Sequence, residues 1–347
     1  MIDLKDFEYT ELEAYMERMG EKKYRAAQIF KWLHEGVISY AQMTDIGKTL
    51  KARLEEDTYV STLAIEQKLV SKLDGTVKYL FRLPDGNCIE SVVMRYIHGL
   101  TICISSQVGC RMGCRFCAST IGGLYRSLTA GEILNQVIFA ERDMGERISN
   151  IVLMGIGEPL DNYDNVIKFL HNVNHEKGKN IGYRHITLST CGIVPGIYAL
   201  ADEGLPITLT ISLHAPNDDI RNTIMPVNRK YPLSELISAC KYYVNKTGRR
   251  LSFEYSLIKG VNDSAANAIE LAALVKPLAA HVNLIPVNKV EERSYRHGSR
   301  NEINAFRDRL TVAGVNATIR RELGADISAS CGQLRKKTIE GRNARCE

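Results

Sequence analysis

Three closely spaced cysteines constrain this chain more than any other feature of its sequence. Cys110, Cys114 and Cys117 stand in the run Cys-Arg-Met-Gly-Cys-Arg-Phe-Cys, a C-x3-C-x2-C triplet. Cysteine thiolates ligate iron–sulfur clusters, so three thiols at this spacing can hold three irons of a [4Fe–4S] cube. A fourth cysteine at similar spacing is absent, which leaves one iron open to bind a small molecule and pass it an electron. The triplet therefore favours a catalytic cluster over simple electron transfer.

Zinc and disulfide bonds explain the triplet less well. A structural zinc site takes four ligands, usually as two pairs, and no second Cys-x2-Cys pair or His partner stands nearby. Nine cysteines are an odd number, and the N-terminus Met-Ile-Asp-Leu-Lys-Asp lacks the basic-then-apolar order of a signal peptide. We therefore expect reduced thiols and a cytoplasmic protein.

Length and composition indicate a globular protein. The 347 residues suffice for one large domain and a smaller appendage. A hydrophobic content of 45% and a charged content of 24% are ordinary for a soluble domain. No apolar run approaches the roughly 20 residues of a membrane helix, so no membrane partner is expected.

The net charge of +5 is unevenly distributed. Residues 1–60 carry 9 Lys+Arg and 12 Asp+Glu, a net charge of −3, which leaves +8 for the remainder. Basic residues are dense near the C-terminus: Arg335, Lys336, Lys337, Arg342 and Arg345. Such a skew suits a polyanionic partner, although a solvated basic tail explains it equally well.

The first third of the chain predicts a helical unit followed by a hairpin. Thr10 and Glu13 suggest a capping box, and residues 24–34 carry a helical apolar stripe. Around the turn sequence Pro-Asp-Gly-Asn at 84–87, two alternating runs predict a β-hairpin. We therefore divide the chain into an N-terminal helical accessory domain (1–65), a β-hairpin extension (66–98) and a catalytic core (99–347).

From residue 99 onward, strand-like and helix-like runs alternate. The predicted strands are 100–105, 150–155, 185–190, 206–213, 251–257 and 281–286. The predicted helices lie near 130–143, 163–175, 232–246, 264–276 and 301–313. This alternation predicts an α/β fold with parallel βα units in an open or closed barrel, whose active groups gather at the carboxyl ends of the strands. The cysteine triplet follows the first of these strands.

Short polar motifs follow the later strands. The second strand leads into Met-Gly-Ile-Gly-Glu-Pro at 154–159, where glycines allow close backbone approach and Glu158 can bind an ammonium group. Ser189 ends the third strand, residues 212–214 end the fourth, and Asn288 follows the sixth. Each motif alone could be a tight turn or a local cap. In order behind a cysteine triplet, they indicate a nucleotide-like cofactor pocket.

The triplet, with Phe116 before its last cysteine, resembles the signature of the radical S-adenosylmethionine (SAM) superfamily. The resemblance implies a partial (β/α)6 barrel, and a [4Fe–4S] cluster whose open iron is chelated by SAM. It also implies that electron transfer cleaves SAM to methionine and a 5′-deoxyadenosyl radical, while the protein supplies position and shielding.

From Tyr24-Arg-Ala-Ala-Gln-Ile-Phe-Lys-Trp-Leu to Cys331-Gly-Gln-Leu, the chain resembles one subfamily, the radical SAM adenine methyltransferases of 23S ribosomal RNA (the RlmN/Cfr family). The resemblance implies the following SAM contacts: Gly157, Glu158, Ser189, Ser212, Leu213, His214 and Asn288. It also gives roles to two further cysteines, Cys103 and Cys331.

In the family's scheme, Cys331 takes a methyl group from one SAM. The radical from a second SAM removes a hydrogen from that S-methyl group, and the resulting carbon radical adds to the adenine ring. A base then removes the ring proton, and Cys103 attacks the Cys331 sulfur to release methylated RNA and leave a transient disulfide. Two SAM molecules are consumed in each turnover.

Glu90 is our candidate for the base. It shares a predicted strand face with Cys88, Val92 and Met94, an unusual place for a carboxylate unless that face borders a cleft. The alternative is a solvated glutamate on an edge strand. The Ile-Glu-Ser context of the family favours the catalytic role, although Cys103 could serve as the base instead.

Pro159 points to the C2-methylating branch, because the C8-methylating (Cfr) relatives tend to carry alanine there. Lys289 departs from the proline common in the C2 branch.

The resemblance implies 23S rRNA as substrate, tRNA at the adenosine beside the anticodon as a second one, and a reductant such as flavodoxin or ferredoxin. A different class, an RNA-binding or electron-carrying iron–sulfur protein, would not need Cys331 or the SAM-like loops.

Overall fold

The computed structural model describes residues 1–287, 294–327 and 329. Within these residues, ten strands form one sheet in the order β14-β13-β12-β11-β10-β9-β6-β5-β4-β3. From β6 to β14 all neighbours are parallel, and from β6 to β3 they are antiparallel. The strands are β3 (Ala64–Val70), β4 (Val77–Arg82), β5 (Cys88–Tyr96), β6 (Gly99–Cys103), β9 (Ile148–Leu153), β10 (Ile186–Thr190), β11 (Thr208–Ser212), β12 (Leu251–Leu257), β13 (His281–Pro286) and β14 (Asn316–Ile319).

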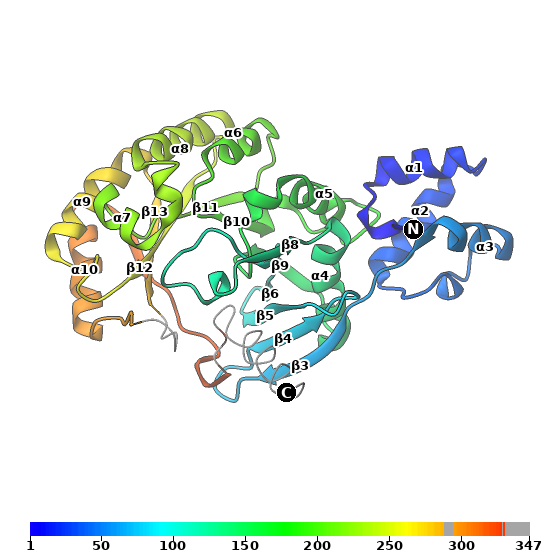
Figure 1. The fold of residues 1–347 in the computed structure, drawn as a ribbon, viewed down its shortest axis with the longest axis horizontal. Coiled ribbons are helices and arrows are strands. Elements are labelled where there is room, and N and C mark those ends of the chain that lie inside the picture. The colour runs from blue at the N-terminus through cyan, green and yellow to red at the C-terminus, as the bar shows by residue number, and fades with distance from the viewer. Residues whose placement is uncertain (288–293, 328, 330–347) are drawn as a thin grey trace.

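Helices between the parallel strands cover the outer side of the curved sheet (Figure 1). They are α4 (Ala130–Met144), α5 (Tyr163–Asn174), α6 (Val194–Asp202), α8 (Leu233–Thr247), α9 (Ala265–Val275) and α10 (Arg300–Val312). The short helix α7 (Asp218–Ile224) packs instead with the cysteine loop, through Ile220 and Ile224. The large core lies between these helices and the sheet, where strand residues such as Ile151, Leu188, Leu209 and Phe253 are fully buried. The predicted partial barrel is confirmed. Its six predicted strands are β6 and β9–β13.

Three elements among the parallel strands and their connecting helices were not predicted from the sequence: β14, α6 and the short helix α7. A seventh parallel strand, β14, pairs with β13 at the open edge of the sheet. Its four residues, Asn-Ala-Thr-Ile, are only half-buried or exposed. The sequence therefore has no apolar run there that would predict a strand. Helix α6 has a proline in its first turn, and this proline made the segment look like a loop in the sequence.

The N-terminal residues form a small helical layer with its own core. Helices α1 (Tyr9–Arg18), α2 (Tyr24–Glu35) and α3 (Lys48–Asp57) bury Leu12, Phe30 and Leu54 together. Strands β1 (Ile2–Asp3) and β2 (Thr58–Tyr59) pair at its base. The predicted capping box at Thr10 is wrong: α1 starts two residues earlier, and its box joins Glu8 and Glu11. The Glu8 carboxylate meets the unpaired N–H groups of the first turn, as an aspartate would.

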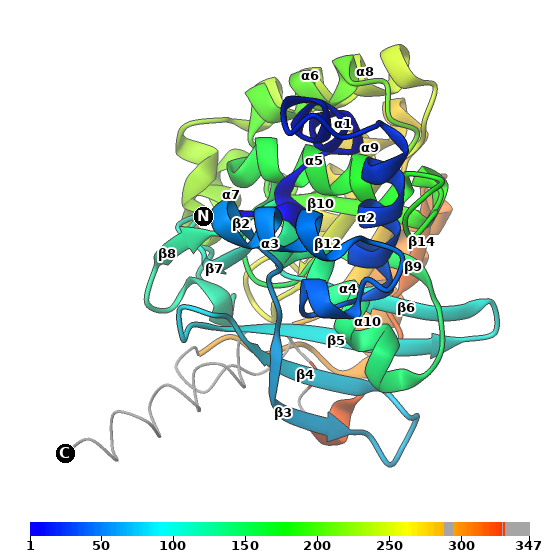
Figure 2. The same cartoon turned by 90° about the vertical axis from the view of Figure 1, so that its right-hand side faces the viewer.

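The helical layer lies beside α4 and α5 of the core (Figures 1 and 2). Polar contacts attach it there. The ammonium of Lys5 donates to Asn135 on α4 at 2.7 Å and to the carbonyl of Ser61 at 2.9 Å. His34, at the end of α2, accepts a hydrogen bond from the backbone N–H of Lys179 at 3.2 Å. Within the described ranges, every helix is too short or too polar to cross a lipid bilayer.

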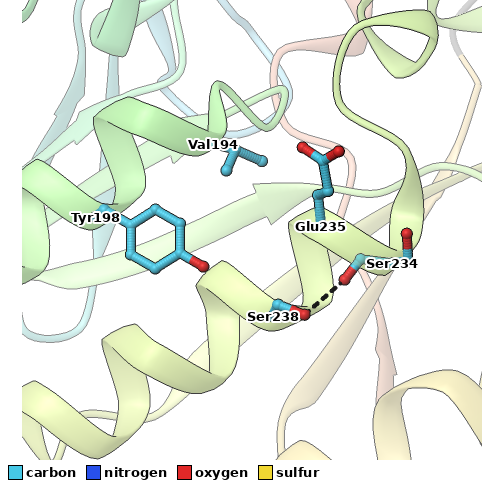
Figure 3. Close-up of a pocket in the computed structure, with 5 residues that line it drawn as sticks. All are labelled: Val194, Tyr198, Ser234, Glu235 and Ser238. Carbon is cyan, nitrogen blue, oxygen red and sulfur yellow. Dashed lines mark hydrogen bonds between the residues drawn. The ribbon is translucent and has the colours of Figure 1, made fainter.

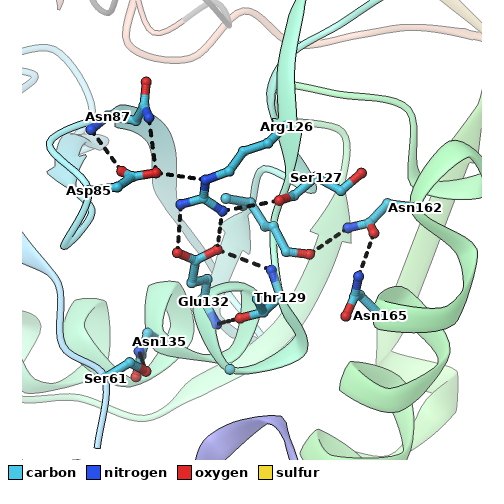
Figure 4. Close-up of polar contacts among 12 residues, drawn as sticks. Ser61, Asp85, Asn87, Arg126, Ser127, Thr129, Glu132, Asn135, Asn162 and Asn165 are labelled. Carbon is cyan, nitrogen blue, oxygen red and sulfur yellow. Dashed lines mark hydrogen bonds and ion pairs between the residues drawn. The ribbon is translucent and has the colours of Figure 1, made fainter. Parts of the chain in front are cut away.

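The predicted hairpin is β4 and β5, and β3 extends it on the far side. Arg126 anchors its turn to the core, as Figure 4 shows. The guanidinium contacts Asp85 in the turn at 2.7 Å and both oxygens of Glu132 on α4 at 2.7 and 2.8 Å. Glu132 also completes a capping box with Thr129 at the start of α4. Turn, hairpin and helix are therefore fixed to one another.

We predict that acid destabilises the protein through His34. Burial lowers the pKa of His34 to about 3 from 6.5. As the pH falls below about 6.5, His34 takes up a proton in the unfolded chain but stays neutral in the folded one. The free energy of unfolding is therefore unaffected by His34 above pH ~6.5, and it falls by up to about 1.4 kcal/mol per pH unit as the pH drops toward 3. Urea unfolding at several pH values should show a slope that His34→Gln flattens. Exposed His98 provides the control, since His98→Gln should leave the slope unchanged. An unaltered slope in His34→Gln would contradict the assignment.

Candidate active site

The cysteine triplet lies in a loop closed by its own small sheet. Strands β7 (Gln107–Gly109) and β8 (Leu124–Ser127) pair in antiparallel fashion at the base of the loop. Gly109, at φ +81°, lets the strands meet, because a Cβ there would lie 2.0 Å from the carbonyl oxygen of Gly123. The hydroxyl of Thr120 donates to the carbonyls of Cys114 and Cys117 at 3.1 and 2.9 Å. The loop is thus held by its own hydrogen bonds.

The three thiols of this loop lie within electrostatic reach of one another. Burial raises the pKa of Cys110 to about 12 and that of Cys114 well above its ordinary value, and the neighbouring sulfurs add to both. Within the described residues, no three His, Cys, Asp or Glu side chains gather as closely as a single metal ion needs. Soft thiolates are the donors that an iron–sulfur cluster requires, so the donor set fits that group.

An apolar bed supports the loop. Cys114 packs with Cys191, Ala215, Met225 and Ile258, and Phe116 lies against the same cluster. Low water access around a cluster is one of the factors that set its reduction potential. This bed joins the cysteine loop to the carboxyl ends of β10–β12.

Arg221 is a site residue that the sequence analysis missed. It is fully buried and holds three carbonyl oxygens at the ends of β10 and β11: those of Cys191 at 2.7 Å, Ser212 at 3.3 Å and Leu213 at 3.0 Å. Asn228 accepts a fourth bond at 2.8 Å. An arginine in a helix ordinarily suggests an exposed face, so nothing in the sequence marked it.

The predicted Gly-x-Gly-Glu loop rests on the chain that follows β6. The carbonyl of Ile156 accepts from the N–H groups of Ser106 and Gln107 at 2.9 and 3.1 Å. A Cβ on Gly155 would lie 2.5 Å from the carbonyl oxygen of Ile104, and one on Gly157 would lie 2.7 Å from the Ser106 hydroxyl. Backbone packing within the protein thus requires both glycines, in addition to any approach of a ligand.

Glu158 is buried at the end of this loop. One carboxylate oxygen accepts from the N–H of Leu160 at 3.0 Å and the other from the N–H of Cys191 at 2.7 Å. Burial raises the pKa of Glu158, and these hydrogen bonds oppose the rise. The buried hydroxyl of Ser106, beside Gly157, has no hydrogen-bond partner among the residues that the structure describes. A buried carboxylate and an unsatisfied hydroxyl fit the ammonium and carboxylate of SAM.

The other predicted SAM contacts lie at neighbouring strand ends. The hydroxyls of Ser189 on β10 and Ser212 on β11 are 3.3 Å apart. Leu213 is fully buried: its N–H donates to the carbonyl of Glu254 at 3.1 Å, and its carbonyl accepts from Arg221. Asn288 lies outside the described residues.

His214 is fixed in one tautomer. Its Nδ1 accepts from the backbone N–H of Ser256 at 2.9 Å, so its proton is on Nε2. The ring meets Phe116 edge to face at 4.8 Å, and burial lowers its pKa to about 3. The residue has a left-handed φ of +58°, and Asn262 holds its carbonyl at 2.7 Å. His214 is therefore a neutral N–H donor.

Cys103 and Glu90 occupy the same face of adjacent strands. Cys103 pairs with Val92 in register, and Glu90 is two residues from Val92 on β5. Glu90 is 2% exposed, and its strand lies inside the sheet between β4 and β6. The alternative of a solvated glutamate on an edge strand is therefore wrong.

The chain that leads to Cys331 reaches this face. Leu323 and Ala329 pack with Val92, Met94 and Cys103. The short helix η8 (Ala325–Ile327) is fastened to the β3–β4 turn: Asp326 accepts from the Ser71 hydroxyl at 2.7 Å and from the Lys72 N–H at 2.9 Å, and Asp74 accepts from the Gly324 N–H at 2.8 Å. Cys331 itself lies outside the described residues.

A cavity of about 310 Å³ lies away from these residues, between α6 and α8 (Figure 3). Val194, Tyr198, Ser234, Glu235 and Ser238 line it. The described residues predicted to bind iron or SAM are not among them. The strand ends, rather than this cavity, carry the chemistry.

The comparisons with known proteins agree with this geometry. Residues 104–272 match the Radical SAM superfamily, and residues 2–60 match the ribosomal RNA large subunit methyltransferase N-terminal domain. A crystal structure of a radical SAM methyltransferase from Sphaerobacter thermophilus matches with a TM-score of 0.91 and 46% identity, covering 96% of this chain and 99% of that one. Fold, cysteine loop and matches define a radical SAM methyltransferase.

Two curated relatives identify the family within the radical SAM methyltransferases. A probable dual-specificity RNA methyltransferase RlmN from Alkaliphilus oremlandii is 56% identical over 98% of this chain and 99% of its own length. The protein of the same name from Clostridium tetani is 54% identical over 99% of this chain and 98% of its own. The chain belongs to the RlmN family of radical SAM methyltransferases, which use a [4Fe–4S] cluster and SAM. The predicted family, enzyme class and cofactors are confirmed.

We predict that Arg221 is essential for the stability of the site. Arg221→Leu would leave three buried carbonyls without their donor, at about 1–3 kcal/mol for each unsatisfied group. Urea unfolding should show a loss of several kcal/mol, and SAM affinity measured by calorimetry should fall. Arg229 is exposed in the same segment, so Arg229→Leu should change neither quantity. Equal behaviour of the two variants would refute this role.

Proposed function

We propose that this enzyme methylates C2 of an adenosine in 23S rRNA, at the peptidyl-transferase centre, and C2 of the adenosine beside the anticodon of tRNA. The names of its relatives, which describe dual-specificity RNA methyltransferases, support two RNA substrates. Pro159 in the Gly-Glu-Pro run supports C2 rather than C8 as the target carbon. Both RNAs are cytoplasmic, so the proposed place of action is the cytoplasm.

The cofactors would be held by the strand ends. Cys110, Cys114 and Cys117 would ligate the cluster. The SAM contacts would be Gly157, Glu158, Ser189, Ser212, Leu213, His214 and Asn288. When bound, these groups supply the methyl group and the radical chemistry that activates it. The chain's own part is to exclude water, and to present a carboxylate and a neutral imidazole N–H.

One observation carries the proposal: Cys103 and Glu90 lie on a buried face against which the chain before Cys331 packs. An electron-carrying protein has no use for this grouping. Together with Cys331, which follows that chain, it would supply the two thiols and the base that methyl transfer to an unactivated ring carbon requires.

The roles follow from the chemistry of each group. Cys331 would carry the methyl carbon to the adenine ring. Glu90 would take the ring proton as the C–H bond breaks, and the electron pair of that bond would return to the ring. The unpaired electron that the radical addition leaves on the ring would pass to a one-electron carrier. The Cys103 thiolate would then attack the Cys331 sulfur, the bond from that sulfur to the methylene carbon would break, and that carbon would take a proton from the Glu90 carboxylic acid. These steps would release the methylated RNA and form a transient disulfide. No disulfide joins the cysteines within the described residues.

The RNA would meet the basic part of the chain. The net charge of +8 beyond residue 60 supports this contact and implies affinity that falls with salt.

We propose the three-part division at residues 65 and 98, with the N-terminal domain and the C-terminal tail as contact surfaces. A one-electron carrier such as flavodoxin or ferredoxin would supply the electrons.

Nucleoside mass spectrometry tests the proposal. A 23S rRNA fragment and a tRNA are incubated anaerobically with reconstituted enzyme, SAM and reductant. We expect 2-methyladenosine from both RNAs, no product from Cys331→Ala, and normal product from Cys346→Ala, which removes a cysteine outside the scheme.

Each other result has a definite meaning. Formation of 8-methyladenosine would show that the C2 assignment is wrong. Product from rRNA alone would remove tRNA as a substrate. No transfer of label from SAM to Cys331 would exclude the whole scheme in favour of an RNA-binding or electron-transfer protein.

A further inference from the structure

A buried lysine pairs with the proposed base. The ammonium of Lys78 on β4 lies 3.0 Å from a carboxylate oxygen of Glu90 on β5, and the two side chains are 0% and 2% exposed. Taking two charges out of water usually costs as much as their attraction returns, so such a pair is weak evidence for a stabilising role. A reason other than stability is therefore needed for its presence.

The position of Lys78 links it to the site. Lys78, Val92 and Cys103 oppose one another in register across β4, β5 and β6, so their side chains share one face. The alternate residues of these strands, among them Tyr79, Phe81 and Ile89, point to the opposite face and pack in the large core. Lys78 is thus directed away from that core, toward the face of Cys103 and Leu323.

The backbone of Glu90 is fixed to the predicted SAM loop. The hydroxyl of Ser105 donates to the Glu90 carbonyl at 2.7 Å and accepts from the N–H of Ile156 at 3.0 Å. With the backbone held there, the remaining freedom of Glu90 is in its side chain. The ammonium of Lys78 is placed to restrict that freedom and to compensate the carboxylate charge.

We propose that Lys78 is a positioning residue for the proton transfer: its ammonium, 3.0 Å from the Glu90 carboxylate, holds that carboxylate oriented toward the adenine ring. When Glu90 accepts the proton, one C–H bond breaks and one O–H bond forms, and Lys78 keeps its own proton throughout. The inference rests on the proposed function, because it needs Glu90 to act as the base. A purely structural ion pair would instead affect every step equally.

The experiment separates the steps of the reaction. The variants are Lys78→Met, Lys78→Arg, Glu90→Gln and the double variant Lys78→Met/Glu90→Gln. Lys68→Met is the matched control, because Lys68 on β3 of the same sheet pairs with Asp143 at 2.6 Å on the surface. Each protein is assayed for methyl transfer from labelled SAM to Cys331 without RNA, for 2-methyladenosine, and for covalent protein–RNA adduct on a denaturing gel.

We expect Lys78→Met to methylate Cys331 at the normal rate, to form product about 10² times more slowly and to accumulate adduct, as loss of a general base does. Lys78→Arg should recover part of the product rate. The double variant should be no slower than Glu90→Gln, because Lys78 acts only through Glu90.

Other outcomes overturn the inference. Normal product from Lys78→Met would leave no role for the lysine in proton transfer, and equal loss of all three activities would make the pair structural. A double variant slower than Glu90→Gln would mean that Lys78 acts independently. Should Lys78→Met not fold, Lys78→Arg, which keeps a cation beside Glu90, is measured instead. Slower product formation with normal methylation of Cys331 supports the positioning role, and equal loss of all three activities makes the pair structural. Wild-type protein that never methylates Cys331 would instead refute the proposed function, and the role of Lys78 with it.

Discussion

The parallel pairing of β6 with β9, continued into the loops beyond both strands, is the contact on which the site depends. Past the strand ends, the carbonyl of Ile156 accepts from two consecutive N–H groups of the chain after β6. The cysteine loop follows β6 and β7 on one side of this junction, and the Glu158 loop follows β9 on the other side. The cysteine loop and the Glu158 loop thereby share one base, although Cys117 and Gly157 lie forty residues apart in the chain.

Much of this architecture was readable from the sequence, and for a physical reason. Buried parallel strands are continuous apolar runs, and the amphipathic helices between them have a different period, so six barrel strands and the β4–β5 hairpin were predicted. Elements that bury little were missed. Strand β14 is half-exposed, β3 is almost wholly exposed, and β7 and β8 are three and four residues long.

The cysteines and the glycine-rich loops of the candidate site were predicted from the sequence, but its buried cations were not. Thiols and glycine-rich loops occur in recognisable order, whereas Arg221 and Lys78 look like ordinary surface residues until the fold buries them. Burial of a cation depends on the partners around it, and Arg221 takes carbonyls from two strands while Lys78 takes a carboxylate from a neighbouring one. Such partners come together only in three dimensions. The capping box at Glu8 was missed because glutamate is a rare cap.

The attachment of the chain before Cys331 differs in kind from that of Cys103. Glu90 and Cys103 are on paired interior strands, so their spacing is as rigid as the sheet. The segment at 323–327 is tied by Asp74 and Asp326, two carboxylates at the molecular surface, to the turn between β3 and β4. Solvated contacts of this sort open before the core does. The spacing of Glu90 and Cys103 is therefore set by the sheet, whereas the position of the segment before Cys331 depends partly on contacts that water can replace.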